Sequence, residues 1–378
     1  MKRHPWLLAL TLSGTLALSA CNGGQGGDEI LIGEFGSLTG TTATFGISTR
    51  NGIDMAIEEV NAAGGVLGRQ VRVIVEDNQG RPEEAQTVVT KLITSDQVVA
   101  VLGEVASSRT LAAAPVAQQN GIPLITPAST NPGVTEVGDY IFRVCFIDPF
   151  QGLVMAKFAF NTLQVRNVAI LRDIRNDYSV GLADVFIENF TQMGGRIVAD
   201  ESYSEGDTDF SAQLTSLRAS NPDAIFIPGY YTEVALIARQ ARGLGMNMPL
   251  MGGDGWDSPR LTEIGGAALN NSYFSNHYSV EDPSPAIQNF VSAYQAKYGE
   301  TPDALAALGY DAAKILFDAI ERAGSTEPEA IRDALAQTEG FPGVTGSITI
   351  DEDRNAVKPA VVLRVVDGTL QYVETIAP

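Results

Sequence analysis

The chain has 378 residues, with 45 acidic and 25 basic side chains and a formal net charge of −20 at pH 7. Because this charge repels phosphate backbones, we expect no nucleic-acid partner. The length allows two ordinary domains with full cores. The two cysteines and two histidines include one of each within the first 21 residues. The remainder therefore lacks the ligands of a usual zinc site, and we expect no metal and no cofactor.

The first 27 residues have the pattern of an export signal followed by a tether. A basic start precedes an apolar run over residues 6–17, and Leu18-Ser19-Ala20-Cys21 is a lipobox. The apolar run is shorter than the roughly 20 residues that a membrane helix needs. We therefore predict a signal peptide over residues 1–20 and lipid on Cys21. Residues 21–27 form a flexible tether, because glycine-rich chain behaves as coil. An uncleaved membrane helix is the alternative.

From residue 28 onward, strand-like and helix-like segments alternate, with glycine or proline between them. The first series predicts strands at 30–33, 71–75, 98–102 and 123–126 and helices at 43–62, 82–94 and 108–119. The second series predicts strands at 168–171, 197–200, 224–227 and 249–251. The last part predicts helices at 285–298, 303–323 and 327–337 and strands at 346–350 and 360–366. This alternation is typical of an α/β protein with parallel sheets and helices on both faces.

Cys145 lies in a strand-like stretch over residues 140–146. We expect it to be a small buried side chain rather than a reactive thiol. Because Cys21 is assigned to lipid, no internal disulfide is possible.

Two loops after predicted strands could hold an anion, because ligands of open α/β sheets bind at the carboxyl ends of strands. The loop over residues 103–110 leads into a helix and presents Ser107 with free amides. The loop over residues 126–132 is a hydroxyl-rich turn with Ser129 and Thr130. A simple helix cap and an ordinary turn are the alternatives.

A third loop, over residues 252–256, places the carboxylate of Asp254 among glycines beside Trp256. A solvated loop aspartate is the alternative. The sequence has no nucleophile elbow, no phosphate-binding loop and no dinucleotide fingerprint, so we predict no catalytic residue. A carboxylate-pair enzyme stays open, although no pair stands out.

Several motifs, taken in order, resemble those of the type I periplasmic solute-binding proteins, in the branch that serves leucine, isoleucine and valine transporters. They are Gly36-Ser37-Leu38-Thr39-Gly40, residues 58–68 (EEVNAAGGVLG), residues 121–130 (GIPLITPAST), Asp209-Phe210-Ser211 and Gly229-Tyr230. The resemblance implies two Rossmann-like lobes with parallel-sheet cores, joined by three crossovers. The implied lobes are 28–147 plus 277–355 (N-lobe) and 148–276 plus 356–378 (C-lobe).

The resemblance also implies roles for individual residues. Hydroxyls and amides hold the ligand's α-carboxylate, an acid pairs with the α-ammonium, and aromatic side chains wall the pocket. The corresponding residues are Ser107, Ala128, Ser129 and Thr130 for the carboxylate; Asp254 and Tyr230 for the ammonium; and Phe45, Tyr178 and the neighbouring Trp256 for the wall. The leucine-binding members have glutamate in place of Asp254, so the ligand is open at this stage.

We therefore expect a non-enzymatic, monomeric receptor that closes around a free amino acid, with leucine, isoleucine or valine as the first choice. It would pass the ligand to the permease of an ABC importer on the exported side of a membrane, held there by the lipid on Cys21. The alternatives are an amide, urea or aromatic acid as ligand, or a sensor read by a signalling partner.

Overall fold

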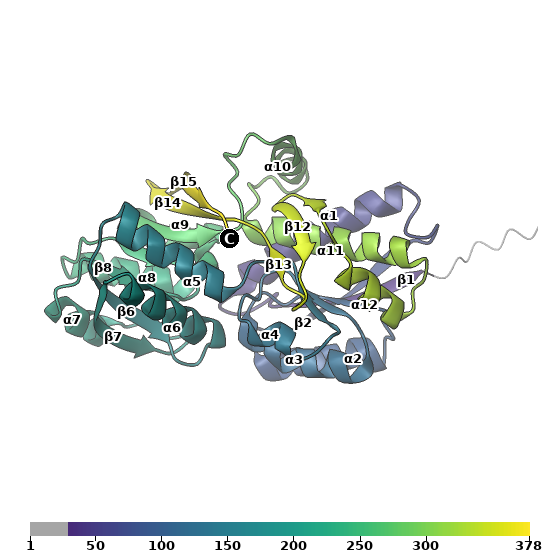
Figure 1. Cartoon of the computed structure of the whole chain (residues 1–378), viewed down its shortest axis with the longest axis horizontal. Coiled ribbons are helices and arrows are strands. Elements are labelled where there is room, and N and C mark those ends of the chain that lie inside the picture. The colour runs from purple at the N-terminus through teal and green to yellow at the C-terminus, as the bar shows by residue number, and fades with distance from the viewer. Residues whose placement is uncertain (1–28) are drawn as a thin grey trace, which may run out of the picture.

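The computed structural model describes residues 29–378, so the predicted signal peptide, lipidated Cys21 and tether lie outside the described residues. Within residues 29–378, no helix has the length and apolar character needed to cross a membrane. The described chain forms two lobes side by side (Figure 1), each built on its own sheet. We call the part around the five-stranded sheet the N-lobe and the part around the seven-stranded sheet the C-lobe.

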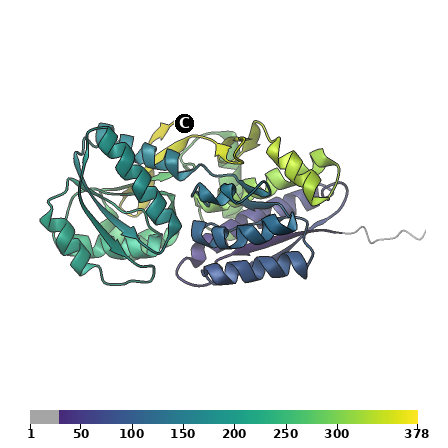
Figure 2. The same cartoon turned by 60° about the horizontal axis from the view of Figure 1, so that its bottom comes forward.

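The N-lobe sheet is parallel throughout, in the order β2-β1-β3-β4-β5. Its strands are β1 (Ile30–Gly36), β2 (Val71–Asp77), β3 (Val101–Leu102), β4 (Leu124–Thr126) and β5 (Ile141–Arg143). One face is covered by α2 (Pro82–Thr94), α3 (Ser107–Asn120) and the short α4 (Gly133–Glu136). The other face is covered by α1 (Ala43–Ala62), α11 (Ala304–Ala323) and α12 (Pro328–Ala336), and α10 (Pro285–Tyr298) stands at the top in Figure 1. In Figure 2 the bottom of the molecule is turned forward, and the blue helices of the first face are in front.

The C-lobe sheet has the order β15-β14-β10-β9-β8-β6-β7. Its strands are β6 (Asn167–Asp173), β7 (Arg196–Tyr203), β8 (Ala224–Phe226), β9 (Leu250–Gly252), β10 (Ser272–Asn276), β14 (Ala360–Val366) and β15 (Thr369–Ile376). The strands from β7 to β10 are parallel, and β14 and β15 add an antiparallel hairpin at one edge. Its helical segments are α5 (Asp148–Lys157) with its π-helical extension η1 (Phe158–Thr162), α6 (Asp177–Gln192), α7 (Ser211–Ala219), α8 (Tyr231–Gly243), η2 (Asp254–Trp256), α9 (Pro259–Gly265) and η3 (Gly266–Leu269).

Helices α1 and α11 come from opposite ends of the described chain and pack in direct backbone contact. A Cβ on Gly52 would lie 1.9 Å from the carbonyl oxygen of Ala306, and one on Gly309 would lie 2.4 Å from that of Thr49. Any larger residue at either glycine would force the helices apart. This close contact attaches a late segment of the chain to the first lobe.

The chain passes between the lobes three times: after β5, after β10 and after β13 (Ala356–Val357). Strand β13 still belongs to a small three-stranded sheet with β11 (Phe341–Gly343) and β12 (Gly346–Ile350). Each crossing segment contributes a buried side chain, namely Phe146, His277 and Lys358. The crossings are therefore part of the packed interior.

The predicted α/β class with parallel-sheet cores is confirmed. The predicted helices at 43–62, 82–94 and 285–298 and the strands at 346–350 and 360–366 have the observed bounds. Cys145 is free and fully buried, as predicted, and burial raises the pKa of its thiol to about 12. The predicted strand at 98–102 is reduced to β3, and β10 and β15 lie where no strand was predicted.

Candidate functional site

A small cavity lies between the lobes, next to segments that follow strands of both sheets. Its volume is about 10 Å³, which is room for about one water molecule. The N-lobe lines it with Phe45, Val105, Ala128 and Leu305, and the C-lobe with Tyr178, Tyr230, Asp254 and Gly255. Five of the predicted site residues therefore meet in one place, although they come from distant parts of the sequence.

Asp254 begins the turn η2 directly after β9, and its side chain is buried. Carboxyl oxygen Oδ1 accepts a hydrogen bond from the Tyr178 hydroxyl at 2.9 Å. Oxygen Oδ2 lies 2.9 Å from Nε2 of His277. The backbone N–H of Asp254 donates to Oε1 of Gln151 at 2.8 Å. Both the backbone and the side chain of this acid are therefore fixed in orientation.

The groups that hold the Asp254 carboxylate are neutral. Burial lowers the pKa of His277 below its usual value, against the opposing effect of Asp254, so the imidazole is neutral at pH 7. Its Nδ1 has no hydrogen-bond partner among the described residues, which assigns the proton to Nε2 and makes that atom the donor. Burial, then the charge of Asp254, raises the pKa of Tyr178, so its hydroxyl also keeps its proton. Within residues 29–378, His277 is the only basic side chain at ion-pair distance from Asp254.

Aromatic rings form the wall around this carboxylate. Tyr178 and Tyr230 are stacked, with ring centroids 5.5 Å apart and an interplanar angle of 9°. Phe45 meets Tyr230 edge to face at 5.2 Å. The apolar side chains of Val105 and Leu305 complete the lining. A ligand in this cavity would have an acid at one end and an apolar surface along its side.

Ser107 and Thr130 lie behind the lining and not in it. Ser107 is the first residue of α3, where backbone N–H groups lack a partner within the helix. Its hydroxyl accepts a hydrogen bond from the backbone N–H of Asn131 at 3.2 Å. The buried hydroxyl of Thr130 makes no hydrogen bond of standard geometry within residues 29–378. It lies near Asp148, whose pKa is raised to about 7 by burial, an effect that this hydroxyl opposes.

The side chain of Ser129 points into the protein. Its hydroxyl lies 2.7 Å from that of Thr110 and 3.0 Å from the carbonyl oxygens of Glu104 and Val105. The hydroxyl of Ser129 therefore does not face the cavity, where the predicted contact with a ligand would need it. Instead, Ser129 fixes the two N-lobe loops to each other.

Trp256 is also directed away from the cavity. Its indole is fully buried, donates from Nε1 to the carbonyl oxygen of Ile227 at 2.9 Å, and packs on Phe274 at 5.9 Å. In the turn η2 the side chain of Asp254 thus points to the cavity, and that of Trp256 points into the C-lobe core.

Five residues around the site were not among the predicted ones: Val105, Gly255, Leu305, His277 and Gln151. Val105 and Leu305 carry no chemical signature in a sequence that is 44% hydrophobic. His277 could have been singled out from the sequence, because it is the only histidine after residue 4.

Direct hydrogen bonds and an ion pair join the lobes around the cavity. They connect Arg109 Nη2 with Glu205 Oε1 at 2.9 Å, Thr44 Oγ1 with Ser258 Oγ at 2.8 Å, Asn131 Nδ2 with the Asp177 carbonyl oxygen at 2.9 Å, and Thr232 Oγ1 with the Thr41 carbonyl oxygen at 2.9 Å. The structure is therefore a closed form, in which the two lobes contact each other along the edge of the cavity.

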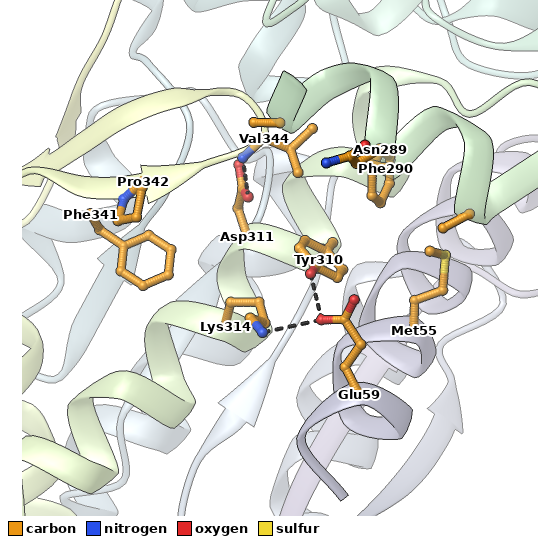
Figure 3. A pocket seen from close by; sticks show the side chains of 12 residues that line it. Met55, Glu59, Asn289, Phe290, Tyr310, Asp311, Lys314, Phe341, Pro342 and Val344 are labelled. Atoms are coloured by element: carbon orange, nitrogen blue, oxygen red, sulfur yellow. Dashed lines mark hydrogen bonds and ion pairs between the residues drawn. The ribbon is translucent and has the colours of Figure 1, made fainter. Parts of the chain in front are cut away.

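Another pocket lies on the N-lobe, between α1, α10, α11 and the β11–β12 hairpin (Figure 3). There Glu59 accepts a hydrogen bond from Tyr310 at 2.6 Å and pairs with Lys314 at 3.1 Å. Asp311 accepts from the backbone N–H of Val344 at 2.7 Å. These polar groups satisfy one another, and none of the predicted site residues lines this pocket.

Two α/β lobes, three crossing segments and a buried cavity between the lobes define a two-lobed solute-binding protein. The sequence matches the profile of the periplasmic binding proteins over residues 29–369. The chain belongs to this family, in the type I branch that includes the leucine-, isoleucine- and valine-binding receptors, as the motifs predicted.

Individual relatives extend over nearly the whole chain. The Leu/Ile/Val-binding protein BraC3 of Rhizobium johnstonii is 32% identical, over 90% of this chain and 93% of its own length. The leucine-binding protein LivK of Thermotoga maritima has a crystal structure that matches with a TM-score of 0.90 and 44% identity, covering 92% of this chain and 99% of that one. The structure of LivJ from Streptococcus pneumoniae, in complex with isoleucine, matches with a TM-score of 0.89 and 37% identity, covering 93% and 100%.

Proposed function

We propose that this protein is an exported receptor that binds a free amino acid, with leucine, isoleucine or valine as the first choice, and delivers it to the permease of an ABC importer. One observation carries the proposal. The carboxylate of Asp254 is buried at the interface of the lobes and is held by the neutral groups of Tyr178 and His277. A buried carboxylate is costly without a cation, and the α-ammonium of an amino acid would supply one.

The other parts of a branched-chain amino acid have counterparts in the same region. The N-terminal N–H groups of α3 and the hydroxyl of Thr130 suit an α-carboxylate. The rings of Phe45 and Tyr230 with Leu305 suit an aliphatic side chain. The relatives support this choice, since LivJ is described in complex with isoleucine and LivK is a leucine-binding protein.

Delivery requires that the lobes open and close. We assign the moving bodies to residues 28–147 plus 277–355 and residues 148–276 plus 356–378, with the crossing segments as hinges. The lipid on Cys21 would hold a monomeric receptor at the membrane, and the closed form would be the one that the permease recognises.

Aromatic acids are the competing ligand class. A solute-binding protein of Rhodopseudomonas palustris that is 26% identical has been crystallised with 3,4-dihydroxybenzoic acid. Such a ligand has no ammonium and would leave the charge of Asp254 uncompensated.

The test is a thermal-shift screen of the purified mature protein against the twenty amino acids, simple amides and benzoates. A ligand that binds only the folded state raises the melting temperature by mass action. We expect shifts with leucine, isoleucine or valine. A shift with benzoates alone would overturn the role of Asp254, and no shift with any compound would overturn the proposal.

A further inference from the structure

His277 connects the site to the segments that cross between the lobes. It follows β10 directly, where the chain leaves the C-lobe sheet, and its side chain is fully buried. Its ring stacks on that of Phe146, with centroids 3.9 Å apart and an interplanar angle of 22°. Phe146 lies in a different crossing segment, between β5 and α5. The imidazole therefore has a fixed plane, set by a ring from another crossing.

From that position Nε2 reaches Oδ2 of Asp254 at 2.9 Å, while Tyr178 occupies Oδ1. A carboxylate has about four acceptor sites, so the two donors orient the group without filling it. The remaining lone pairs are available to a second donor. The hydrogen bond from His277 thus leaves acceptor sites on Asp254 for an ammonium group.

We propose that His277 is a positioning residue for ligand binding: it orients the carboxylate of Asp254 toward the cavity and ties it to the crossing segments. This inference rests on the proposed function, because it assumes that Asp254 receives a ligand cation. Protonation of His277 at Nδ1 would place a cation beside Asp254 in place of the ligand's ammonium. Binding and protonation at this histidine are therefore competitive.

Burial, rather than the surrounding charges, favours the neutral form of His277 at pH 7. Burial has the largest effect, the carboxylate of Asp254 opposes it, and Lys358 in the third crossing adds to it. Burial lowers the pKa of Lys358 itself to about 8. Tyr178, Cys145 and Asp148 lie near Asp254. Burial raises the pKa of each of them, and the charge of Asp254 adds to this effect. Asp148, with a pKa of about 7, also titrates within the pH interval of the experiment, so the test must separate it from His277.

The experiment measures leucine and isoleucine binding by calorimetry between pH 8 and pH 4.5, for the wild type and two variants. His277→Gln retains an N–H donor that does not titrate, and His277→Phe retains a flat ring for Phe146 without the donor. We expect wild-type affinity to fall on acidification below the histidine pKa, approaching tenfold per pH unit. The affinity of His277→Gln should not fall in this way at low pH. At pH 7 His277→Phe should bind about tenfold more weakly or worse, because a bond to a charged group is lost.

Melting temperatures of all three proteins separate misfolding from weak binding. If the wild type binds no amino acid at pH 7, the proposed function fails. If it binds but His277→Gln has the same pH profile, the inference fails and a group other than His277 is the one that titrates.

A ligand-free measurement tests the contact itself. The chain has two histidines, so the ¹⁵N imidazole signals of His277 are assigned by their loss in His277→Gln. We expect a proton on Nε2 at pH 7 and a pKa that falls further in Asp254→Asn. An unchanged pKa in Asp254→Asn would overturn the coupling, whatever the ligand is.

Discussion

Phe45 and Tyr230 meet edge to face across the interface between the lobes, with ring centroids 5.2 Å apart and an interplanar angle of 89°. Phe45 lies on α1 of the N-lobe, and Tyr230 immediately precedes α8 of the C-lobe. Neither ring alone forms a wall of the cavity, so the site is complete only when the lobes are together. A ligand that contacts both rings would stabilise the closed form, which is how a binding event becomes a change of shape.

Replacement of Asp254 by asparagine should remove most of the affinity for an amino acid. Asparagine preserves the size of the side chain, but the ligand's ammonium would then be buried without a countercharge. We expect a loss of about 2–5 kcal/mol in binding free energy, measured by calorimetry. Glu263→Gln, which removes an exposed carboxylate from the same lobe, is the matched control and should bind normally. Near wild-type affinity in Asp254→Asn would exclude Asp254 as the ammonium partner.

Thr130 and Ser129 are adjacent, yet their substitution should have opposite effects. Thr130→Val should weaken binding by about 1–3 kcal/mol, because the ligand's carboxylate loses a hydroxyl donor while the backbone N–H groups remain. Ser129→Ala should instead lower stability, because its hydroxyl bonds to Thr110 and to two carbonyl oxygens. Calorimetry and thermal unfolding of both variants distinguish these roles. The reverse pattern would mean that the ligand's carboxylate is bound through Ser129.

The ion pair between Arg109 and Glu205 should stabilise the closed form. The two side chains come from different lobes, and Glu205 is 32% exposed while Arg109 is 3% exposed. Because the Glu205 carboxylate is about one-third exposed, solvent screening limits the contribution of this pair to about 1 kcal/mol or less. We therefore expect Glu205→Gln to weaken ligand binding by a few-fold, with a smaller difference from wild type at high salt. Small-angle scattering should detect a larger radius of gyration in the ligand-free variant. An unchanged radius and affinity would contradict this role.

Glu34 should make stability depend on pH. It lies in β1, is 2% exposed, and its Oε2 has no hydrogen-bond partner among the described residues. Burial, and then the charge of Asp54, raises the pKa of Glu34 to about 8 from a usual value near 4.5. Between these values the folded state binds a proton that the unfolded state lacks, so stability falls as pH rises.

Glu34→Gln should remove this dependence and stabilise the protein at pH 9 relative to the wild type. Urea unfolding at pH 5, 7 and 9 measures the effect. A free-energy difference between the two proteins that is the same at all three pH values would show that Glu34 keeps an ordinary pKa.

The sequence predicted the elements that have strong local patterns. Asp254 could be singled out from the sequence because it stands among glycines after an apolar strand. Helix α2 could be predicted because it begins with proline and has acids in its first turn. Strand β15 was not predicted because it is a partly exposed edge strand in which Thr, Gln and Glu interrupt the apolar residues. The direction of Trp256 could not be predicted, since it depends on the tight turn η2 between strand and helix. Leu305 could be placed at the site only through the long-range packing of α11.

The close packing of α1 on α11, at Gly52 against Ala306 and at Gly309 against Thr49, has a consequence for the order in which this protein can fold. The five strands of the N-lobe sheet are all present once residue 143 has been synthesised, but one face of α1 stays bare until residues 304–323 follow. The C-lobe sheet likewise waits for β14 and β15 at residues 360–376. Neither lobe can be completed early as an independent unit, so the nascent chain stays incompletely packed until almost its full length has been made.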